Sequence, residues 1–299
     1  MESAQVSTKK RLIIFIVITF IIAWTFFLML RFLDIPYGQM NSIIYLIAAM
    51  FAPTLGNILT RLITKEGFKN MYLRPNFKGH VKAYLLIFFM PSILLFISGA
   101  VYFLIMPNML DRDLTAINQL VSMKGGGISV QTIIIALVLQ IVFAGPIINL
   151  IPTLGEELGW RGYLLPKLQE YFSDKKAVII TGVIWGLWHA PIIAMGHNYG
   201  TDYWAYPWTG ILGMVIFCVV LGIIEGYFTI KLKSAIPAAM IHSTVNAGAG
   251  LPVYFAKSGY NTLLGPAITG IIGIIPFLIL AIILFIQIGK KENISDEPH

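Results

Sequence analysis

Residues 11–33 read RLIIFIVITFIIAWTFFLMLRFL, an apolar run whose charges are confined to Arg11 and Arg31. Because about 20 apolar residues in a helix cross a bilayer core of about 30 Å, this run predicts a transmembrane helix. Similar runs recur between polar or Gly/Pro-containing breaks, at 41–63, 82–106, 132–152, 177–196, 208–230, 235–255 and 265–288. We therefore predict an all-α, polytopic membrane bundle of eight transmembrane helices, forming one integral membrane domain over residues 1–299.

The composition supports this class and excludes others. Hydrophobic residues make up 57% of the 299 positions and charged residues only 12%, which is more apolar surface than a water-soluble core needs. The single cysteine, Cys218, lies inside the sixth run, so neither a disulfide framework nor a thiolate metal site is available. The first run is too long for a signal peptide and no small-residue cleavage site follows it, so we expect a retained first helix.

The net charge of +7 reflects membrane topology. If the N-terminus with Lys9, Lys10 and Arg11 is cytoplasmic, eight crossings leave all but four of the 21 Lys and Arg residues on the cytoplasmic side. The four on the other side are Arg31, Arg112, Lys124 and Lys257. The positive-inside rule therefore predicts cytoplasmic termini, and no nucleic-acid partner is needed to explain the charge. The basic loop 64–81 can contact anionic lipid headgroups or a substrate.

Ionisable residues are costly inside a bilayer, and three groups of them stand out. In Gly155-Glu156-Glu157-Leu158-Gly159-Trp160-Arg161-Gly162, which follows Pro152, we expect a helix start that favours carboxylates. Glu157 and Arg161 are four apart and can form a bidentate pair, which leaves Glu156 without a local partner and suited to act as a general base. The alternative is a surface ion-pair motif at a cytoplasmic helix end.

Two histidines complete the pattern. His189 lies about 18 Å along the fifth run, near mid-membrane, where it is either catalytic or bonds a backbone carbonyl freed by Pro191. His242 and Asn246 share a face of the seventh run, where they can donate to an oxyanion or simply bond a neighbouring helix. Glu225 is expected to be an ordinary interfacial glutamate rather than a cavity residue. We assign His197 and the aromatic residues after the fifth run to an interfacial aromatic belt.

These residues lie on separate predicted helices, and we expect their polar groups to bond one another and not separate partners. Amide hydrolysis needs a base that activates water, a group that orients or protonates, and donors for the tetrahedral oxyanion. The patterns Glu156-Glu157…Arg161, Trp185…His189 and His242…Asn246 resemble, in order, the motifs of the CPBP or Abi family of intramembrane proteases, which includes the type II CAAX prenyl endopeptidases. The resemblance covers about 150–250, and the first four predicted helices carry no family motif.

The resemblance implies roles for each residue. Glu156 and His189 would activate water, Glu157 and Arg161 would fix the position of Glu156, and His242 with Asn246 would form the oxyanion hole. Trp185 stands where the family more often has phenylalanine, and we expect the chemistry to be unchanged.

Metal dependence is a separate question. If a metal is bound, Glu156, His189 and His242 are its expected ligands, with zinc the candidate ion. The chain has no H-E-x-x-H motif, and a glutamate-driven mechanism accounts for the same residues, so we expect no obligatory metal.

The expected partners are membrane lipid and a peptide or lipidated protein, with the plasma membrane as the location if the chain is prokaryotic. A CAAX substrate would be cut just after its prenylated cysteine, in a cavity open to the cytosol and to lipid. Two other functions stay open: a secondary transporter with buried charges, and a non-catalytic immunity or regulatory membrane protein. Neither the natural substrate nor the oligomeric state follows from the sequence.

Overall fold

The structure, a computed structural model, describes residues 6–123 and 127–289. Its described part is all-α, with a single isolated β-bridge between Leu110 and Ala256, so the predicted fold class is confirmed. The α-helices are α1 (Thr8–Phe32), α2 (Met40–Met50), α3 (Ala52–Ile63), α4 (Val81–Ile105), α5 (Thr115–Met123), α6 (Val130–Leu139), α7 (Gly145–Ile148), α8 (Leu150–Gly159), α9 (Leu165–Gln169), α10 (Asp174–Trp188), α11 (Ala190–Ile193), α12 (Trp208–Leu232), α13 (Ile236–Gly248) and α14 (Ile275–Gln287). Gln140–Ala144 and Trp160–Leu164 are π-helical turns, and Pro107–Met109 and Leu251–Phe255 are 3-10 helical.

Helical segments long and apolar enough to cross a bilayer establish a multi-pass membrane protein. Five such segments lie in the described part of the chain, at Thr8–Phe32, Met40–Ile63, Val81–Ile105, Val130–Ile148 and Trp208–Leu232. They agree closely with four of the predicted runs and with most of the run at 132–152.

The three other predicted helices are shorter than expected, and prolines explain two of the differences. The fifth run divides into α10 and α11 because Pro191 has no amide hydrogen to donate to the carbonyl of Leu187. The eighth run becomes helical only at Ile275, where Pro276 occupies the first turn and its missing amide hydrogen is not needed. The seventh run is α-helical only from Ile236 to Gly248. The count of eight crossings therefore remains a prediction.

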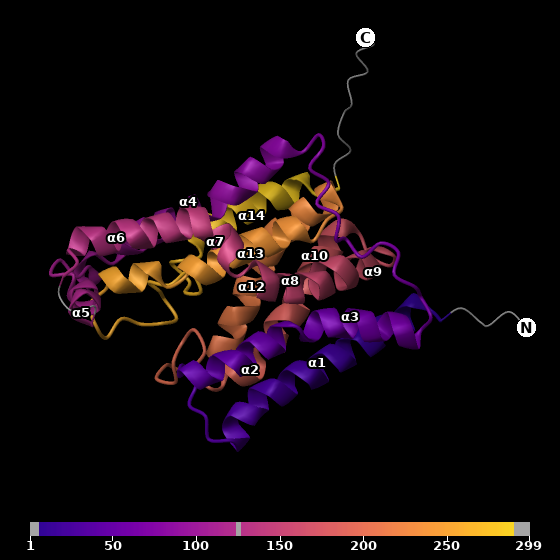
Figure 1. Ribbon diagram of the computed structural model, residues 1–299, viewed down its shortest axis with the longest axis horizontal. Coiled ribbons are helices and arrows are strands. Elements are labelled where there is room, and N and C mark those ends of the chain that lie inside the picture. The colour runs from indigo at the N-terminus through magenta and orange to yellow at the C-terminus, as the bar shows by residue number, and fades with distance from the viewer. Residues whose placement is uncertain (1–5, 124–126, 290–299) are drawn as a thin grey trace, which may run out of the picture.

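Two opposite ends of the bundle matter for the site. At one end, which we call the terminal end, the start of α1 lies near α9 and the chain leaves α14 (Figure 1). Its contacts include Lys9 N to the Tyr171 hydroxyl at 3.2 Å and Ala235 N to the Tyr72 carbonyl at 2.9 Å. At the other, which we call the far end, lie the α1–α2 connection and residues 194–207, joined by a 2.5 Å hydrogen bond between the Tyr37 hydroxyl and His197 Nδ1.

The glutamate motif at 155–162 does not begin a helix, contrary to the sequence-based expectation. Helix α8 starts earlier, at Leu150, where Asn149 departs from helical geometry and its N–H donates to Ser243 Oγ at 3.0 Å. Both glutamates therefore lie in the last turns of α8, and Arg161 lies in the π-helical turn that follows. Inserted π turns are frequent at functional sites because they redirect side chains without ending the helix.

Small residues bring α10 against α12 and so set the depth of the site. A Cβ atom on Gly182 would lie 2.7 Å from the Val219 Cα, and one on Gly186 would lie 2.5 Å from the Val215 Cα. Such distances are too short for any side chain, so the two backbones approach as closely as small residues at membrane-helix interfaces allow. The approach holds the end of α10, with its tryptophans and His189, against the middle of the bundle.

Candidate active site

Trp185 connects the first glutamate to the first histidine. Its indole Nε1–H donates to Glu156 Oε2 at 2.9 Å, and its backbone carbonyl accepts from His189 Nδ1 at 2.9 Å. Glu156 is 2% exposed and His189 8% exposed. The carbonyl bond considered as a structural explanation for His189 is thus present, but it uses only Nδ1. It fixes the tautomer in which Nε2 is an unprotonated acceptor, because the hydrogen bond made by one ring nitrogen sets which nitrogen carries the proton.

Arg161 is shared between two carboxylates. Its Nη1 lies 3.0 Å and 2.9 Å from the two oxygens of Glu157, and its Nη2 lies 2.5 Å from Glu225 Oε2. The predicted pairing of Glu157 with Arg161 is confirmed, but only one nitrogen takes part, because the other contacts Glu225. All three side chains are fully buried. The surface ion-pair alternative and the interfacial placement of Glu225 are therefore wrong.

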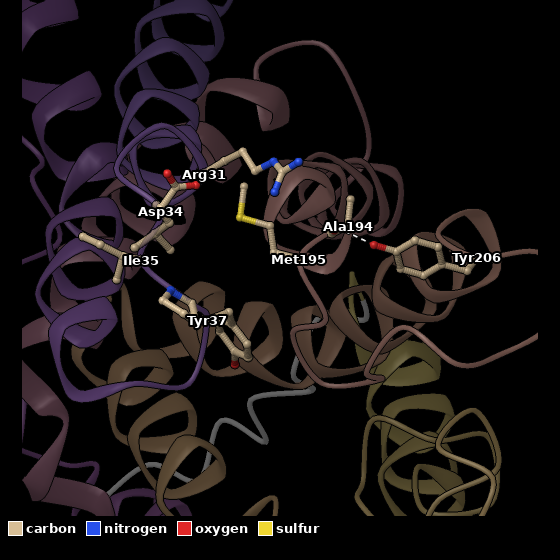
Figure 2. A pocket seen from close by; sticks show the side chains of 9 residues that line it. Arg31, Asp34, Ile35, Tyr37, Ala194, Met195 and Tyr206 are labelled. Carbon is tan, nitrogen blue, oxygen red and sulfur yellow. Dashed lines mark hydrogen bonds between the residues drawn. The ribbon is translucent and has the colours of Figure 1, made fainter.

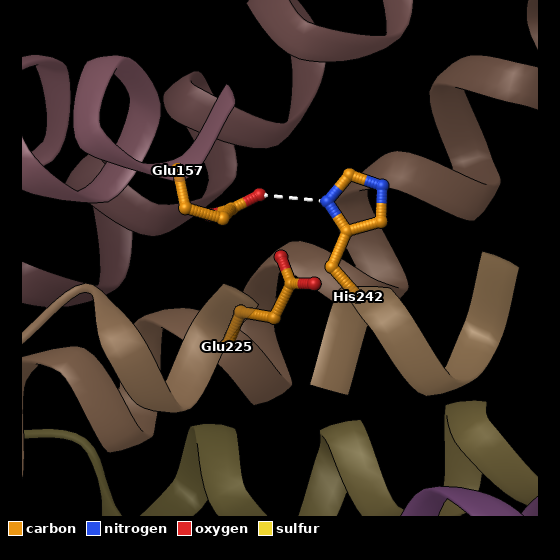
Figure 3. A group of neighbouring side chains, drawn as sticks. All are labelled: Glu157, Glu225 and His242. Carbon is orange, nitrogen blue, oxygen red and sulfur yellow. Dashed lines mark hydrogen bonds and ion pairs between the residues drawn. The ribbon is translucent and has the colours of Figure 1, made fainter. Parts of the chain in front are cut away.

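His242 joins this group from α13. Its Nδ1 lies 3.0 Å from Glu157 Oε1, and its ring packs edge-on against Trp185 at 5.1 Å between centroids. Figure 3 shows Glu157, Glu225 and His242 converging from three helices. Because a carboxylate accepts, Nδ1 carries the proton and Nε2 is left for another partner.

A cavity of about 270 Å³ brings four of the predicted residues together. Its polar lining consists of Glu156, His189, His197, Asn198, His242, Asn246 and Thr269. Its apolar lining includes Phe27, Leu46, Met50, Met214, Phe217 and Leu221. Glu157 and Arg161 do not line the cavity themselves. Glu157 contacts the lining residue His242, and Arg161 contacts the lining residue Trp185. The structure thus separates the six predicted residues into four that face the cavity and two that hold others in place.

A larger hollow of about 600 Å³ adjoins this site at the far end. Figure 2 shows Arg31, Asp34 and Tyr37 on one side of it and Met195 and Tyr206 on the other. Its Tyr37 hydroxyl bonds His197, which lines the 270 Å³ cavity, so the two hollows share one wall. His197, assigned from the sequence to an aromatic belt, therefore also borders the candidate site.

The expected metal ligands do not form a compact set. Among the described residues, the group of three whose ligand atoms lie within 4.8 Å of one another is Glu157, Glu225 and His242, which does not include Glu156 or His189. That group already contacts a cation, because Arg161 lies 2.9 Å from Glu157 and 2.5 Å from Glu225. A divalent ion there would meet the guanidinium charge at close range. The residues therefore do not fit a zinc site, and no step of the mechanism is derived through a metal.

Two residues outside the predicted set contribute to the site. Trp185 was treated as equivalent to phenylalanine, yet its indole N–H is what bonds Glu156. Glu225 was expected to be an interfacial glutamate, but it pairs with Arg161. Gly222 leaves the space for this pair, because a Cβ atom there would lie 3.1 Å from Arg161 Nη2. The glycines flanking Glu225 were the available signal.

Fold and site together define a multi-pass membrane protein with a buried glutamate–histidine site. Residues 132–248 match the family described as "Type II CAAX prenyl endopeptidase Rce1-like". A stretch of 93 residues is 38% identical to CAAX prenyl protease 2 of Methanococcus maripaludis, covering 30% of this chain and 34% of the relative. The chain thus matches about a third of the length of that curated relative. The resemblance inferred from the motifs is confirmed, and the matched region contains every predicted site residue.

Proposed function

We propose that the protein is an intramembrane endopeptidase that cleaves membrane-associated polypeptides with a water molecule activated by Glu156 and His189. The observation that carries the proposal is the pair of hydrogen bonds made by Trp185. Its indole N–H binds the Glu156 carboxylate and its backbone carbonyl binds the His189 imidazole, so both groups are held on one wall of one cavity. The similarity to a family named for a prenyl endopeptidase supports the same reaction class.

The side chains suit the chemistry of amide hydrolysis. Glu156 takes a proton from water while His189 Nε2, unprotonated in this geometry, accepts a second hydrogen bond from it. The resulting hydroxide attacks the carbonyl carbon, and the C–N bond breaks as the proton held by Glu156 passes to the leaving amine. Both groups are buried, which excludes bulk water and strengthens electrostatic effects at the reacting atoms.

Stabilisation of the oxyanion is assigned to His242 and Asn246. His242 donates Nδ1–H to Glu157, so it presents a proton on Nε2 only when the ring is an imidazolium. Glu157, in contact with that ring, offsets the imidazolium charge. The Asn246 amide, exposed and one helical turn further along α13, supplies a second donor.

The proposed topology has eight crossings with both termini in the cytoplasm. The crossings are α1, α2 with α3, α4, α6 through α9, α10 with α11, α12, α13 and α14. The charge distribution supports this orientation, since basic residues concentrate at the terminal end. The name of the relative makes prenylated CAAX proteins one candidate substrate class.

The first test is cleavage by the protein purified in detergent. Quenched fluorescent substrates, one a prenylated CAAX peptide and one an unprenylated apolar peptide, would be incubated with wild type, Glu156→Gln and His242→Ala. We expect both variants to lose at least about 100-fold in kcat. Asp202→Asn, a matched change at an exposed loop position, should retain full activity. A strong zinc chelator should leave the wild-type rate unchanged, whereas equal rates in wild type and Glu156→Gln would refute the assignment.

A further inference from the structure

A hollow at the terminal end gathers basic residues from two parts of the chain. It has a volume of about 720 Å³ and is lined by residues 68–74 together with Asn76 and Lys233. The first group belongs to the connection from α3 to α4, which crosses the terminal end (Figure 1), and Lys233 belongs to the turn between α12 and α13. We call this space the basic hollow.

Three cations line the basic hollow without a counterion in the described part of the chain. Lys69, Arg74 and Lys233 are all exposed, and among the described residues no carboxylate lines the hollow or forms an ion pair with them. Glu66, the acidic residue just before the lining segment, already contacts three other cations at 2.8–3.9 Å. Because like charges around one space repel one another, an anion in the hollow is favoured.

Hydrogen bonds hold the walls of the basic hollow in place. The buried Arg61 donates through Nη1 to two backbone carbonyls of residues 67–69, at 2.9 Å and 3.1 Å. Asn76 Nδ2 donates to the Leu232 carbonyl at 2.8 Å, and Ala235 N donates to the Tyr72 carbonyl at 2.9 Å. Because the walls are ordered before a ligand arrives, binding costs little conformational entropy.

The ends of three membrane-crossing segments surround the basic hollow. Helix α3 ends at Ile63, α4 begins at Val81 and α12 ends at Leu232, and each belongs to a segment long and apolar enough to cross a bilayer. Such segments end where the hydrocarbon core meets the lipid headgroups. The hollow therefore lies at the level of phospholipid phosphates.

Apolar side chains lie next to the cations. Phe68 and Leu73 belong to the lining and are 51% and 50% exposed, and the neighbouring Phe77 is 54% exposed. Exposed aromatic and aliphatic side chains beside Lys and Arg are typical of a surface that meets acyl chains and anionic headgroups together. A free anion or an acidic peptide would leave these apolar side chains uncovered, so the lining favours a lipid.

We propose that the basic hollow binds an anionic phospholipid. The lipid phosphate lies between Lys69, Arg74 and Lys233, and the acyl chains pack against Phe68 and Leu73. Charge-assisted hydrogen bonds to the phosphate offset the repulsion among the three cations. This binding site is separate from the cavity that contains Glu156 and does not depend on the proposed peptidase function.

The lining segment also supports two elements that carry site residues. The Met71 carbonyl lies against the π-helical turn that contains Arg161, because a Cβ atom on Gly162 in that turn would lie 3.1 Å from it. The Tyr72 carbonyl accepts from Ala235 N, directly before α13. A lipid that holds residues 68–74 in place therefore stabilises the folded protein, which a thermal measurement detects.

Thermal unfolding of the full-length protein tests the proposal. Wild type, stripped of lipid in a neutral detergent and a phosphate-free buffer, would receive phosphatidylglycerol, phosphatidylcholine, inorganic phosphate or an acidic peptide. We expect saturating phosphatidylglycerol to raise Tm by about 4 °C or more, and the other three to change it by less than about 1 °C. No rise with phosphatidylglycerol, or an equal rise with any of the other three, would overturn the proposal.

Two variants with the same loss of charge locate the binding site. Lys69→Gln with Arg74→Gln removes two cations from the basic hollow, whereas Lys9→Gln with Lys176→Gln removes two exposed cations from the terminal end outside it. The first variant should lose at least half of the rise in Tm, and the second should keep it. Equal losses in the two variants would mean that the lipid senses only the overall surface charge, which would overturn the proposal.

Native mass spectrometry adds a test that needs no variant. Wild type would be incubated with equal amounts of phosphatidylglycerol and phosphatidylcholine before transfer to the gas phase. We expect the protein to retain one phosphatidylglycerol molecule at least about tenfold more often than one phosphatidylcholine molecule. Equal retention of the two lipids would overturn the proposal.

Discussion

Two ion-pair clusters in the molecule have opposite compositions. In the deep cluster, one cation, Arg161, lies between the carboxylates of Glu157 and Glu225, and every member is fully buried. In the cluster at the terminal end, Glu66 lies 3.6 Å from Arg11, 3.9 Å from Arg61 and 2.8 Å from Lys167, and the exposed Glu170 lies 2.8 Å from the same lysine. The Glu66 side chain is 12% exposed. The deep cluster has excess negative charge, and the terminal cluster has excess positive charge.

The difference follows from the surroundings of each cluster. Excess positive charge at the terminal end is tolerated because water and lipid headgroups lie nearby, and it agrees with a cytoplasmic location. Excess negative charge in the interior needs a partner, and His242, 3.0 Å from Glu157, supplies one when it is protonated. The deep cluster can therefore keep His242, the proposed oxyanion donor, charged, whereas the terminal cluster joins α1, the loop after α3, and α9.

The largest effect is expected from Arg161→Met. The substitution leaves two buried carboxylates without their shared cation, a change that typically destabilises a protein by about 3–5 kcal/mol. Thermal unfolding in detergent should show a large fall in Tm, and cleavage should be abolished because Glu157 no longer holds His242.

The matched control is the double variant Arg161→Met with Glu225→Gln, which removes one of the stranded charges. It should recover part of the lost Tm without restoring activity. A single variant as stable as wild type would show that the deep cluster does not hold the buried charges as the structure indicates.

A second, smaller effect is expected from Trp185→Phe. The phenyl ring keeps the packing against His242 but cannot donate to Glu156, so the carboxylate loses a charge-assisted hydrogen bond of about 1.5–3 kcal/mol. We expect kcat to fall by about 10- to 100-fold with little change in KM or Tm.

Trp188→Phe is the matched control. Trp188 Nε1 has no hydrogen-bond partner among the described residues, and its ring packs against His189, Phe27 and Trp160. It should alter Tm more than kcat. Equal losses of kcat in the two variants would mean that the indole N–H of Trp185 does not position Glu156.

The sequence predicted much of this arrangement, for identifiable reasons. Long apolar runs mark helices by length alone, and a spacing of four places Glu157 beside Arg161 whatever the rest of the fold does. Partners across helices carry no such local signal. Neither the contact of Arg161 with Glu225, 64 positions further along the chain, nor that of Glu157 with His242 follows from spacing.

Helix boundaries near prolines were the least predictable part. A proline belongs in a first helical turn, so Pro152 suggested a helix start just after it, at the glutamate motif. Tertiary contacts decided otherwise, because Ser243 bonds the backbone at Asn149 and α8 begins with Leu150.

The smallest effect is expected in the terminal cluster. Burial alone would raise the pKa of Glu66, but hydrogen bonds from Lys167 and Tyr163 and the charges of Lys167 and Arg61 outweigh it, so the pKa lies below its ordinary value of 4.5. A carboxyl group whose pKa is lower in the folded state than in the unfolded state stabilises the protein at pH values above the unfolded-state pKa. That contribution is lost as the pH falls through the folded-state pKa.

Glu66→Gln should therefore lower Tm by about 2–4 °C at pH 7, corresponding to about 1 kcal/mol for a partly screened ion pair. The difference from wild type should shrink as the pH falls below about 4.5 and as salt is added. Asp34→Asn, at an exposed carboxylate far from the cluster, should leave Tm unchanged across the same range. A loss in Glu66→Gln that persisted at low pH and high salt would come from packing rather than charge. Electrostatic interactions would then govern only the deep cluster, which contacts the proposed catalytic groups.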